Sequence, residues 1–418
     1  MRFTLFEFQL AKRLYTSKKG VKRISKPAVF IAVLGIAIGF IVMMITIAVV
    51  IGFKGEIRNK AVGFSSDIQL SNYNTMASYE SHPIAVSDSL LTALQEYLDT
   101  RWVQRYSTKV GMIKTESSFQ GMILKGVAQE FDTSFFTKYL VEGTLPAFND
   151  STSTNEVMLS KTVADLLDIH LDDRIFTYYA EDEGIKARRL KVVGIYQTNF
   201  YEYDKLYLLT DLYTVNKLNR WGVDQASGVE IAIKDYAKLE EVTEDLGDKF
   251  MGLEDAYGEP YIVNNVEQLN PQLFGWLALL DLNVWVILGL MMAISGFTII
   301  SGLLILILER TQMIGLLKGL GATNKMIRKV FIWLAIFLIG KGLFWGNIVG
   351  LSLCLIQSKF GVVPLDPAVY HVDKVPISLS LWWVVALNAA TILISVLMLL
   401  GPSYLVSRIN PATSMRYE

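Results

Sequence analysis

Four long runs of apolar residues stand out from a chain that otherwise mixes polar and apolar positions. They cover residues 28–53, 282–308, 330–357 and 381–401. Each run reaches the roughly 20 residues that a helix needs to cross the ~30 Å hydrocarbon core of a bilayer. A soluble protein rarely carries four such runs as buried core helices. The pattern therefore predicts four transmembrane helices.

The basic residues beside these runs predict their orientation. Lysine and arginine are frequent in residues 1–27, 309–329 and 402–418, where few acidic residues oppose them. Cytoplasmic flanks of membrane helices carry such an excess. We therefore expect the N-terminal segment, the loop between the second and third helices and the C-terminal tail in the cytoplasm. Residues 54–281 and the short loop 358–380 are then expected outside.

Composition supports this division. The chain is 52% hydrophobic and only 19% charged, whereas about a quarter of the residues of soluble domains are charged. Its net charge of −1 hides an asymmetry, because residues 54–281 hold 35 of the 40 acidic residues but 21 of the 39 basic ones. That block carries a net charge of −14 and the rest of the chain +13. The two parts are therefore expected to face different surroundings.

The outer block alternates between strand-like and helix-like periodicity, which predicts a mixed α/β domain. Its clearest elements are a β-hairpin, a strand that runs into a helix capped by Ser160, and an amphipathic helix. They cover residues 175–179 with 190–195, 157–167, and 235–250. The hairpin has an acidic tip, which is interpreted as a solvated turn rather than a cation site.

The first two apolar runs extend beyond the thickness of a bilayer. The first opens with Ser25 as a helix cap and Pro27 in the first turn, and its helical pattern continues through Arg58. The second can begin near Pro271 and run to Leu308, roughly 57 Å at the standard rise. We expect the two extensions to form stalks that carry the outer domain.

The N-terminal segment predicts a further helix. Apolar residues at positions 3, 6, 10 and 14 share one helical face, so residues 3–16 are expected to lie along the cytoplasmic surface. The basic run 18–23 is interpreted as a topology signal beside anionic headgroups, not as a nucleic-acid patch. The following apolar run is too long for a secretory signal and is expected to remain in the protein.

The sequence contains few residues in arrangements typical of catalytic sites. The histidines His82, His170 and His371 are isolated, and neither a Gly-x-x-x-x-Gly-Lys-Ser/Thr phosphate loop nor a Gly-x-Ser-x-Gly elbow occurs. The single cysteine, Cys354, excludes an intrachain disulfide. We expect no metal site and no cofactor bound by this chain. If the protein uses ATP, another chain must hydrolyse it.

The loop between the second and third runs carries the most specific sequence. Residues 309–323 are amphipathic and contain three glycines, each of which weakens an isolated helix by about 1 kcal/mol relative to alanine. A close-fitting partner surface explains such a segment, and an ordinary interhelical loop is the alternative. Glu309-Arg310 followed by residues 314–323 resembles the coupling-loop signature of FtsX/MacB-type ABC transporter permeases. Residues 407–418 resemble the ending typical of that family.

Further segments resemble the lipoprotein-releasing LolC/LolE permeases within this family. They are residues 50–57, 156–160 and 365–376. The resemblance implies a four-helix permease of the bacterial inner membrane with a periplasmic domain of the MacB-like core type, and not an enzyme. It implies that ATP and magnesium bind to a separate ABC ATPase. A second permease copy or paralogue, lipoprotein cargo and membrane lipids are the other expected partners, and nucleic acid is not.

The resemblance also assigns candidate site residues. The coupling loop docks on the ATPase in that family, which points to Glu309, Arg310, Met313, Gly315, Leu317, Lys318, Gly321 and Ala322. The family forms its cargo cavity from the first two helices, where the candidate lining residues are Met43, Ile47, Val50, Val286 and Leu290. LolC-like subunits recruit a periplasmic chaperone through an extended hairpin. The corresponding residues 178–189 are short and acidic here, so a chaperone contact through this chain stays open.

Small residues and one charge mark the membrane segments. A small-xxx-small spacing predicts close helix packing, within the chain rather than at a dimer face; the glycines concerned are Gly35, Gly39, Gly342, Gly346 and Gly350. Lys341 is a charge in the third run, where a lysine costs about 2.5–3.5 kcal/mol at the bilayer centre. A functional role is one interpretation. We favour a third helix that starts later, with the lysine reaching the cytoplasmic surface.

Several functions fit this architecture. We favour ATP-driven extraction and release of lipoproteins from the outer leaflet of the inner membrane. An FtsX-like permease that transmits force to an envelope hydrolase and a MacB-like efflux permease are the alternatives, and a receptor that transports nothing is a further one. Neither the cargo nor the choice between homodimer and heterodimer follows from the sequence.

Overall fold

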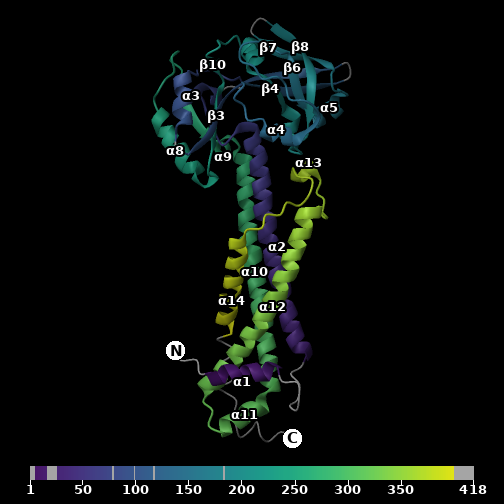
Figure 1. The fold of residues 1–418 in the computed structure, drawn as a ribbon, viewed down its shortest axis with the longest axis vertical. Helices are drawn as coiled ribbons and strands as arrows, with labels where there is room; N and C mark the ends of the chain where they lie inside the picture. The colour runs from purple at the N-terminus through teal and green to yellow at the C-terminus, as the bar shows by residue number, and fades with distance from the viewer. Residues whose placement is uncertain are drawn as a thin grey trace. The chain divides into compact units, whose positions relative to one another are not determined.

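The structure is a computed structural model that describes residues 5–16, 26–77, 80–97, 99–115, 118–181 and 184–399 (Figure 1). These residues form two compact units. The helical unit belongs to residues 1–54, 277–364 and 375–418, and the α/β unit to residues 55–276 and 365–374. Several predicted features lie outside the described residues: the basic run 18–23, the cap Ser25, the hairpin-tip residues 182–183 and the C-terminal tail with its signature 407–418.

Long helices make up the helical unit. They are α1 (Leu5–Thr16), α2 (Lys26–Ser65), α10 (Pro271–Glu309), α11 (Thr311–Gly319), α12 (Asn324–Phe360) and α14 (Leu381–Met398). Four of them, α2, α10, α12 and α14, are long and apolar enough to cross a membrane, and the described residues contain no others. The prediction of four apolar membrane helices is therefore confirmed.

α2 and α10 are longer than the apolar runs predicted to cross the membrane, and each extends beyond its run on the side of the α/β unit. α2 has 40 residues and α10 has 39, about 60 Å each at the standard rise. α2 continues past Arg58, and α10 begins at Pro271, where the sequence pattern places its start. Both helices contribute residues to both units.

The start of α12 corrects one expectation. The helix begins at Asn324 and is unbroken at Lys341, so the interpretation that it starts later is wrong. Thr323 explains the early start, because its side chain caps the helix by accepting a hydrogen bond from the amide of Met326 at 3.3 Å. The Lys341 side chain is exposed on the surface of the helical unit.

A ten-stranded sheet organises the α/β unit. Its order is β12-β1-β11-β3-β4-β9-β6-β8-β5, and β7 pairs with β3 and β8. The strands are β1 (Ile68–Asn72), β3 (Thr100–Lys114), β4 (Phe119–Val127), β5 (Leu140–Gly143), β6 (Glu156–Ser160), β7 (Arg174–Glu181), β8 (Gly184–Tyr196), β9 (Tyr207–Asp211), β11 (Gly228–Ile233) and β12 (Tyr261–Asn265). β4 with β9 and β6 with β8 are parallel pairs in an otherwise antiparallel sheet. A separate small sheet pairs β2 (Ile84–Ala85) with β10 (Gln225–Ala226). The predicted mixed α/β domain is confirmed.

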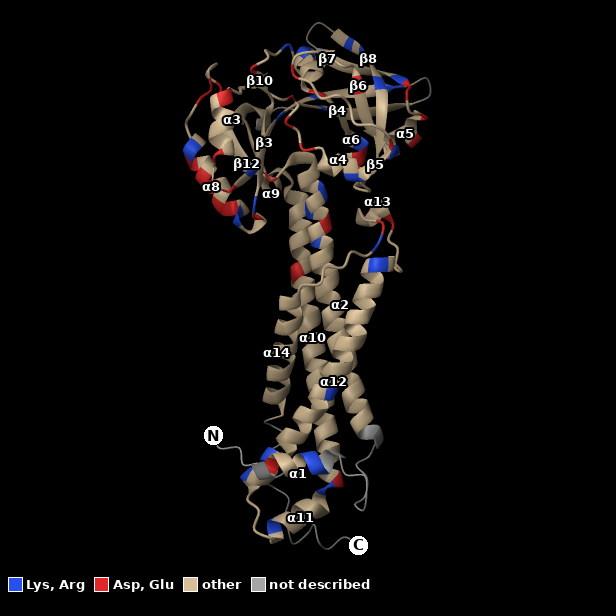
Figure 2. Cartoon of the chain, viewed as in Figure 1, with Lys and Arg blue, Asp and Glu red and all other residues tan. Residues whose placement is uncertain are grey.

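Short helices connect and cover these strands. They are α3 (Asp88–Gln95), α4 (Ser134–Tyr139), α5 (Lys161–Leu167), α6 (Tyr201–Leu206), α7 (Leu212–Asn219), α8 (Leu239–Phe250), α9 (Val266–Leu269) and α13 (Pro367–Tyr370), with 3-10 turns η1 (Tyr73–Ala77) and η2 (Tyr236–Lys238). Acidic residues of this unit are frequent on α8 (Figure 2).

The predicted hairpin and the predicted strand–helix unit are both present in the α/β unit. β7 and β8 form the expected hairpin, with Ile175 opposite Leu190. β6 runs into α5, and Ser160 caps that helix by accepting a hydrogen bond from the amide of Val163 at 3.1 Å. The amphipathic helix starts later than predicted, at the beginning of α8. Asp235 accepts a hydrogen bond from the amide of Ala237, which starts a 3-10 turn in place of the first α-helical turn.

Candidate functional site

The inner face of α11 is covered by the helical unit. Ile314 and Gly315 are buried, and Leu317 and Ala322 pack against the apolar core that α2, α10 and α12 form. These contacts come from successive turns, so α11 is held firmly against the membrane helices on either side of it in the chain.

The end of α11 explains one of its glycines. Gly321 has a φ of +88°, a left-handed conformation that side chains rarely adopt. The amide of Ala322 donates a hydrogen bond to the carbonyl of Leu317 at 2.9 Å, as in the Schellman ending of helices. Thr323 then caps α12. α11 and α12 are therefore joined by a tight turn with a defined geometry.

The outer face of α11 is apolar and open. Leu316 is 57% exposed and Leu320 is 78% exposed. They lie four residues apart, one helical turn along the same face, with the exposed Gly319 beside them. An exposed apolar patch between polar surroundings commonly marks a protein interaction site. Neither leucine is among the predicted coupling residues, although their spacing opposite Ile314 indicates an outer apolar face.

The predicted coupling residues are divided between the two faces. Glu309 ends α10 with its side chain exposed, and Arg310 is the first residue before α11. Met313 and Lys318 are half-buried on its flanks, and Gly315 is buried. Four of the predicted residues, Met313, Gly315, Leu317 and Lys318, lie on α11, and the other four flank its two ends. Gly315 lies on the inner face, where a small residue allows close packing.

α1 packs beside this turn, against the first part of α12. The ring of Phe8 stands edge-on to Trp333 with centroids 5.1 Å apart, and its centroid is 5.7 Å from that of Phe337. Glu7 is buried, with Oε1 3.6 Å from Lys329 Nζ. In the helical unit, charged residues lie on α1, around α11 and at both ends of α12, whereas α14 has none (Figure 2).

The five glycines with the predicted small-xxx-small spacing lie at close helix contacts. A Cβ on Gly342 would lie 2.7 Å from the Ile36 side chain, and one on Gly346 would lie 3.1 Å from Phe40. Both contacts join α12 to α2. Gly35, Gly39 and Gly350 make similar approaches, to Thr298, Ser295 and Met44. α2 therefore packs closely against α10 and α12 within one chain.

The candidate cavity residues do not share one surface. Met43 and Ile47 are buried in the core of the helical unit, and Val50 is half-buried. Val286 and Leu290 lie on α10 with exposed side chains. Within a single chain, α10 thus offers an open apolar face, and the three α2 residues lie mostly behind the surface.

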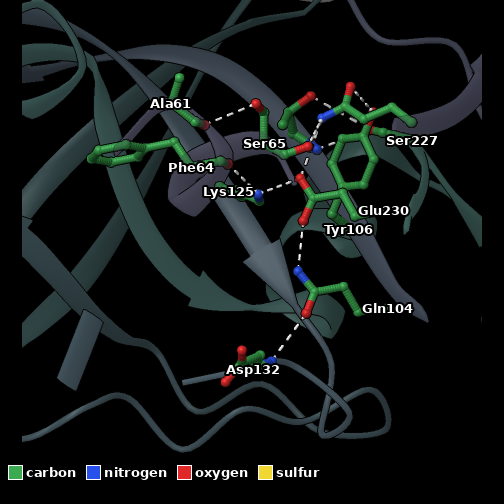
Figure 3. Close-up of polar contacts among 11 residues, drawn as sticks. Ala61, Phe64, Ser65, Gln104, Tyr106, Lys125, Asp132, Ser227 and Glu230 are labelled. Carbon is green, nitrogen blue, oxygen red and sulfur yellow. Dashed lines mark hydrogen bonds and ion pairs between the residues drawn. The ribbon is translucent and has the colours of Figure 1, made fainter. Parts of the chain in front are cut away.

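A buried ion pair anchors the end of α2 in the α/β unit (Figure 3). Lys125 on β4 places Nζ 2.5 Å from Glu230 Oε1 on β11, and donates a second hydrogen bond to the carbonyl of Phe64 at 2.6 Å. Lys125 and Glu230 are 3% and 1% exposed. The last carbonyls of a helix lack intrahelical donors, so Lys125 satisfies one of them and joins α2 to the sheet.

Amide side chains complete this network. Gln104 Nε2 donates to Glu230 Oε2 at 2.7 Å and accepts from the amide of Asp132 at 3.0 Å through Oε1. Gln69 Nε2 donates to Glu230 Oε1 at 3.3 Å and to the carbonyl of Ser65 at 3.0 Å. Burial first, and then the charge of Glu230, raises the pKa of Tyr207 to about 12. The arrangement links α2, β1, β3, β4 and β11 through one buried polar network.

The described residues offer no group of three or more His, Cys, Asp or Glu side chains placed to hold a metal ion. The three histidines lie apart in the α/β unit. His82 precedes β2, His170 follows α5 and His371 follows α13.

Two families match the chain, and together they span most of it. The MacB-like periplasmic core domain matches residues 29–249, and the FtsX-like permease C-terminal domain matches residues 285–411. The first match covers more than half of the chain.

Curated relatives are similar over nearly their whole length. The lipoprotein-releasing system transmembrane protein LolC of Xylella fastidiosa is 23% identical over 407 residues, 93% of each chain. LolE of Haemophilus influenzae is 20% identical over 395 residues, 91% of this chain and 92% of LolE. Among solved structures, the periplasmic region of MacB from Actinobacillus actinomycetemcomitans matches 51% of this chain and 94% of its own, with 13% identity and a TM-score of 0.34.

Proposed function

We propose that this chain, which belongs to the ABC transporter permeases built from a MacB-like periplasmic core domain and an FtsX-like C-terminal domain, releases lipoproteins from the membrane. In this proposal a separate ABC ATPase hydrolyses ATP and a second permease, either a copy or a paralogue, completes the membrane part. The names of the LolC and LolE relatives support lipoproteins as the cargo.

One observation carries the assignment of the ATPase contact. α11 exposes Leu316 and Leu320 on one face while its other face is packed into the helical unit. A helix that is held on one side and apolar on the other is suited to receive force from a partner. The ATPase covers these leucines in our proposal, and the charged flanks of α11 border the contact.

The proposed orientation follows from charge. α1, α11 and the C-terminal tail lie in the cytoplasm, where the basic residues near α1 and α11 suit the anionic inner surface. The acidic α/β unit then lies in the periplasm, and the membrane concerned is the bacterial inner membrane.

Force transmission in this proposal uses helix continuity. α10 is one helix from Pro271 to Glu309, and α11 follows directly. α2 is likewise one helix up to Ser65, where the Lys125 anchor holds its end in the α/β unit. Closure of the ATPase displaces α11, and the two long helices carry the displacement outward.

Cargo binding in this proposal uses the apolar face of α10. Val286 and Leu290 are exposed there, and the acyl chains of a lipoprotein need such a surface. Met43 and Ile47 support the face from inside the helical core, and the second permease closes it. A chaperone that receives the cargo in the periplasm is a further partner of this proposal.

The test is purification in mild detergent followed by mass spectrometry and reconstitution. We expect an ABC ATPase and lipidated proteins to stay bound, and ATP to release the lipoprotein from proteoliposomes. Co-purification of an outer-membrane duct would favour efflux instead. An envelope hydrolase activated by ATP without any cargo release would favour mechanical signalling.

A further inference from the structure

The chain between α12 and α14 contains a segment that belongs to the α/β unit. Residues 365–374 make their contacts there, although the residues before and after them belong to the helical unit. The amide of Leu365 donates to the carbonyl of Asp373 at 3.0 Å, which closes the segment into a loop. Asp366 caps α13 inside it by accepting from the amide of Ala368 at 3.0 Å. The segment is therefore a compact, preformed element.

A buried lysine of α2 holds this loop. Lys60 Nζ donates a hydrogen bond to the carbonyl of His371 at 2.8 Å, and Lys60 is only 2% exposed. The ring of His371 stands edge-on to Phe200 with centroids 5.3 Å apart, and Val372 is buried next to it. His371 therefore holds the loop through one lysine hydrogen bond and one ring contact, and the loop also buries Val372.

Charged groups from every neighbouring element face this contact. α2 contributes Glu56, α4 contributes Lys138, and α6 contributes Glu202 and Asp204, while Asp373 comes from the loop itself. Three of these carboxylates, those of Glu56, Asp373 and Asp204, act on the lysine ammonium. Burial is the larger effect and disfavours the charged lysine, and these carboxylates offset part of it.

Two buried atoms show that the docked loop is incompletely satisfied. Among the described residues, Asp204 Oδ2 and His371 Nδ1 have no hydrogen-bond partner. Burial raises the pKa of Asp204 to about 6 and lowers the pKa of His371. An unpaired buried polar atom costs free energy, and for His371 Nδ1 that cost falls on the loop in its docked position.

We propose that residues 365–374 form a latch by which the α/β unit grips the chain between α12 and α14, with Lys60 as the positioning residue that holds the His371 carbonyl. Movement of α12 or α14 pulls the latch open, and its return restores the contact. The latch needs only groups of this chain, so it stands independently of the cargo.

Hydrogen–deuterium exchange of the full chain in nanodiscs tests the latch. Lys60→Met keeps a long unbranched side chain, one atom shorter, and removes its charge and its hydrogen bonds. We expect the amides of residues 365–374 to exchange at least tenfold faster, while β3 and β4 stay protected. Lys60→Arg restores a charged donor and should recover most of the protection. Lys54→Met, on the same helix but outside the contact, should leave these amides as in the wild type.

A second variant, on the loop side of the contact, tests the latch even if Lys60→Met does not fold. Val372→Asp places a charge in the loop without altering α2 or the sheet, and should accelerate the same amides. Unchanged exchange of residues 365–374 in Val372→Asp, or in a folded Lys60→Met, overturns the latch. Equal loosening of the whole α/β unit by Lys60→Met also overturns it, because Lys60 would then serve folding alone. The exchange measurement uses neither ATPase nor lipoprotein. A failure to release cargo would therefore overturn the proposed function without affecting the test of the latch.

Discussion

Lys125 and Glu230 form an ion pair at 2.5 Å between β4 and β11, and the same lysine donates to the backbone at the end of α2. Because both side chains are almost fully buried, removing one partner leaves the other charge without compensation. We expect Lys125→Met to lower the stability of the α/β unit by about 3–5 kcal/mol.

Thermal unfolding of the full chain in detergent, followed by hydrogen exchange in the α/β unit, checks this prediction. Lys238→Met is the matched control, because Lys238 pairs with Asp99 on the surface and exposed pairs contribute little to stability. Equal losses in the two variants would show that the buried pair is not an anchor.

Neighbouring glycines of α12 have different surroundings. Gly342 faces Ile36 closely, whereas a Cβ on Gly340 meets nothing within 4 Å. Gly342→Ala should therefore destabilise the helical unit by about 1–3 kcal/mol through overpacking. Gly340→Ala should be neutral or stabilise by up to about 1 kcal/mol, since alanine favours the helix. Unfolding in mixed detergent micelles measures both, and a reversed order would refute the packing of α2 on α12.

Asn347 and Asn388 exchange side-chain hydrogen bonds at 2.8 and 3.1 Å between α12 and α14. Such polar contacts between membrane helices contribute about 0.6–2 kcal/mol. We expect Asn347→Leu to destabilise α14 packing by that amount. In the double-mutant cycle, adding Asn388→Leu should cost little more, because the pair is already broken. Additive losses would mean that the two amides act independently.

Asp204 predicts a pH dependence of stability. Burial raises its pKa to about 6 from an ordinary value of 3.8, so the folded state holds this proton more tightly than the unfolded state. Burying Asp204 therefore lowers the free energy of unfolding only slightly at pH 4. The loss grows as the pH rises and levels off once the pH passes about 6. Asp204→Asn removes the charge. The free energy of unfolding of the variant should therefore exceed that of the wild type by about 3 kcal/mol at pH 7.5 but by much less at pH 4. Melting temperatures at the two pH values test this, and a difference that does not vary with pH would count against a buried carboxylate.

Much of the fold follows from local patterns in the sequence. The apolar runs predict four membrane helices, and the pattern through Arg58 and back to Pro271 predicts the length of α2 and α10. Ser160 is recognisable as a cap because its hydroxyl precedes a helical run. The early start of α12 was missed because polar residues such as Lys325 and Arg328 hide the helix when only hydrophobicity is considered.

The site depends more on contacts between distant residues. The Lys125–Glu230 pair joins positions 105 residues apart, and no local pattern predicts that two charges are buried together. Glycine spacing in α12 indicates close packing but not that α2 is the partner. The coupling segment is recognisable by resemblance, whereas the exposure of Leu316 and Leu320 depends on which face of α11 the helical unit covers.

The central claim is that the outer face of α11 docks an ABC ATPase in the cytoplasm. A photo-crosslinking amino acid at Leu320 tests it in cells, with the same label at Phe119, an exposed residue of the α/β unit, as the control. The account predicts that the Leu320 label captures an ABC ATPase and that the Phe119 label does not. Capture of a periplasmic protein at Leu320, or of the ATPase at Phe119, would contradict it.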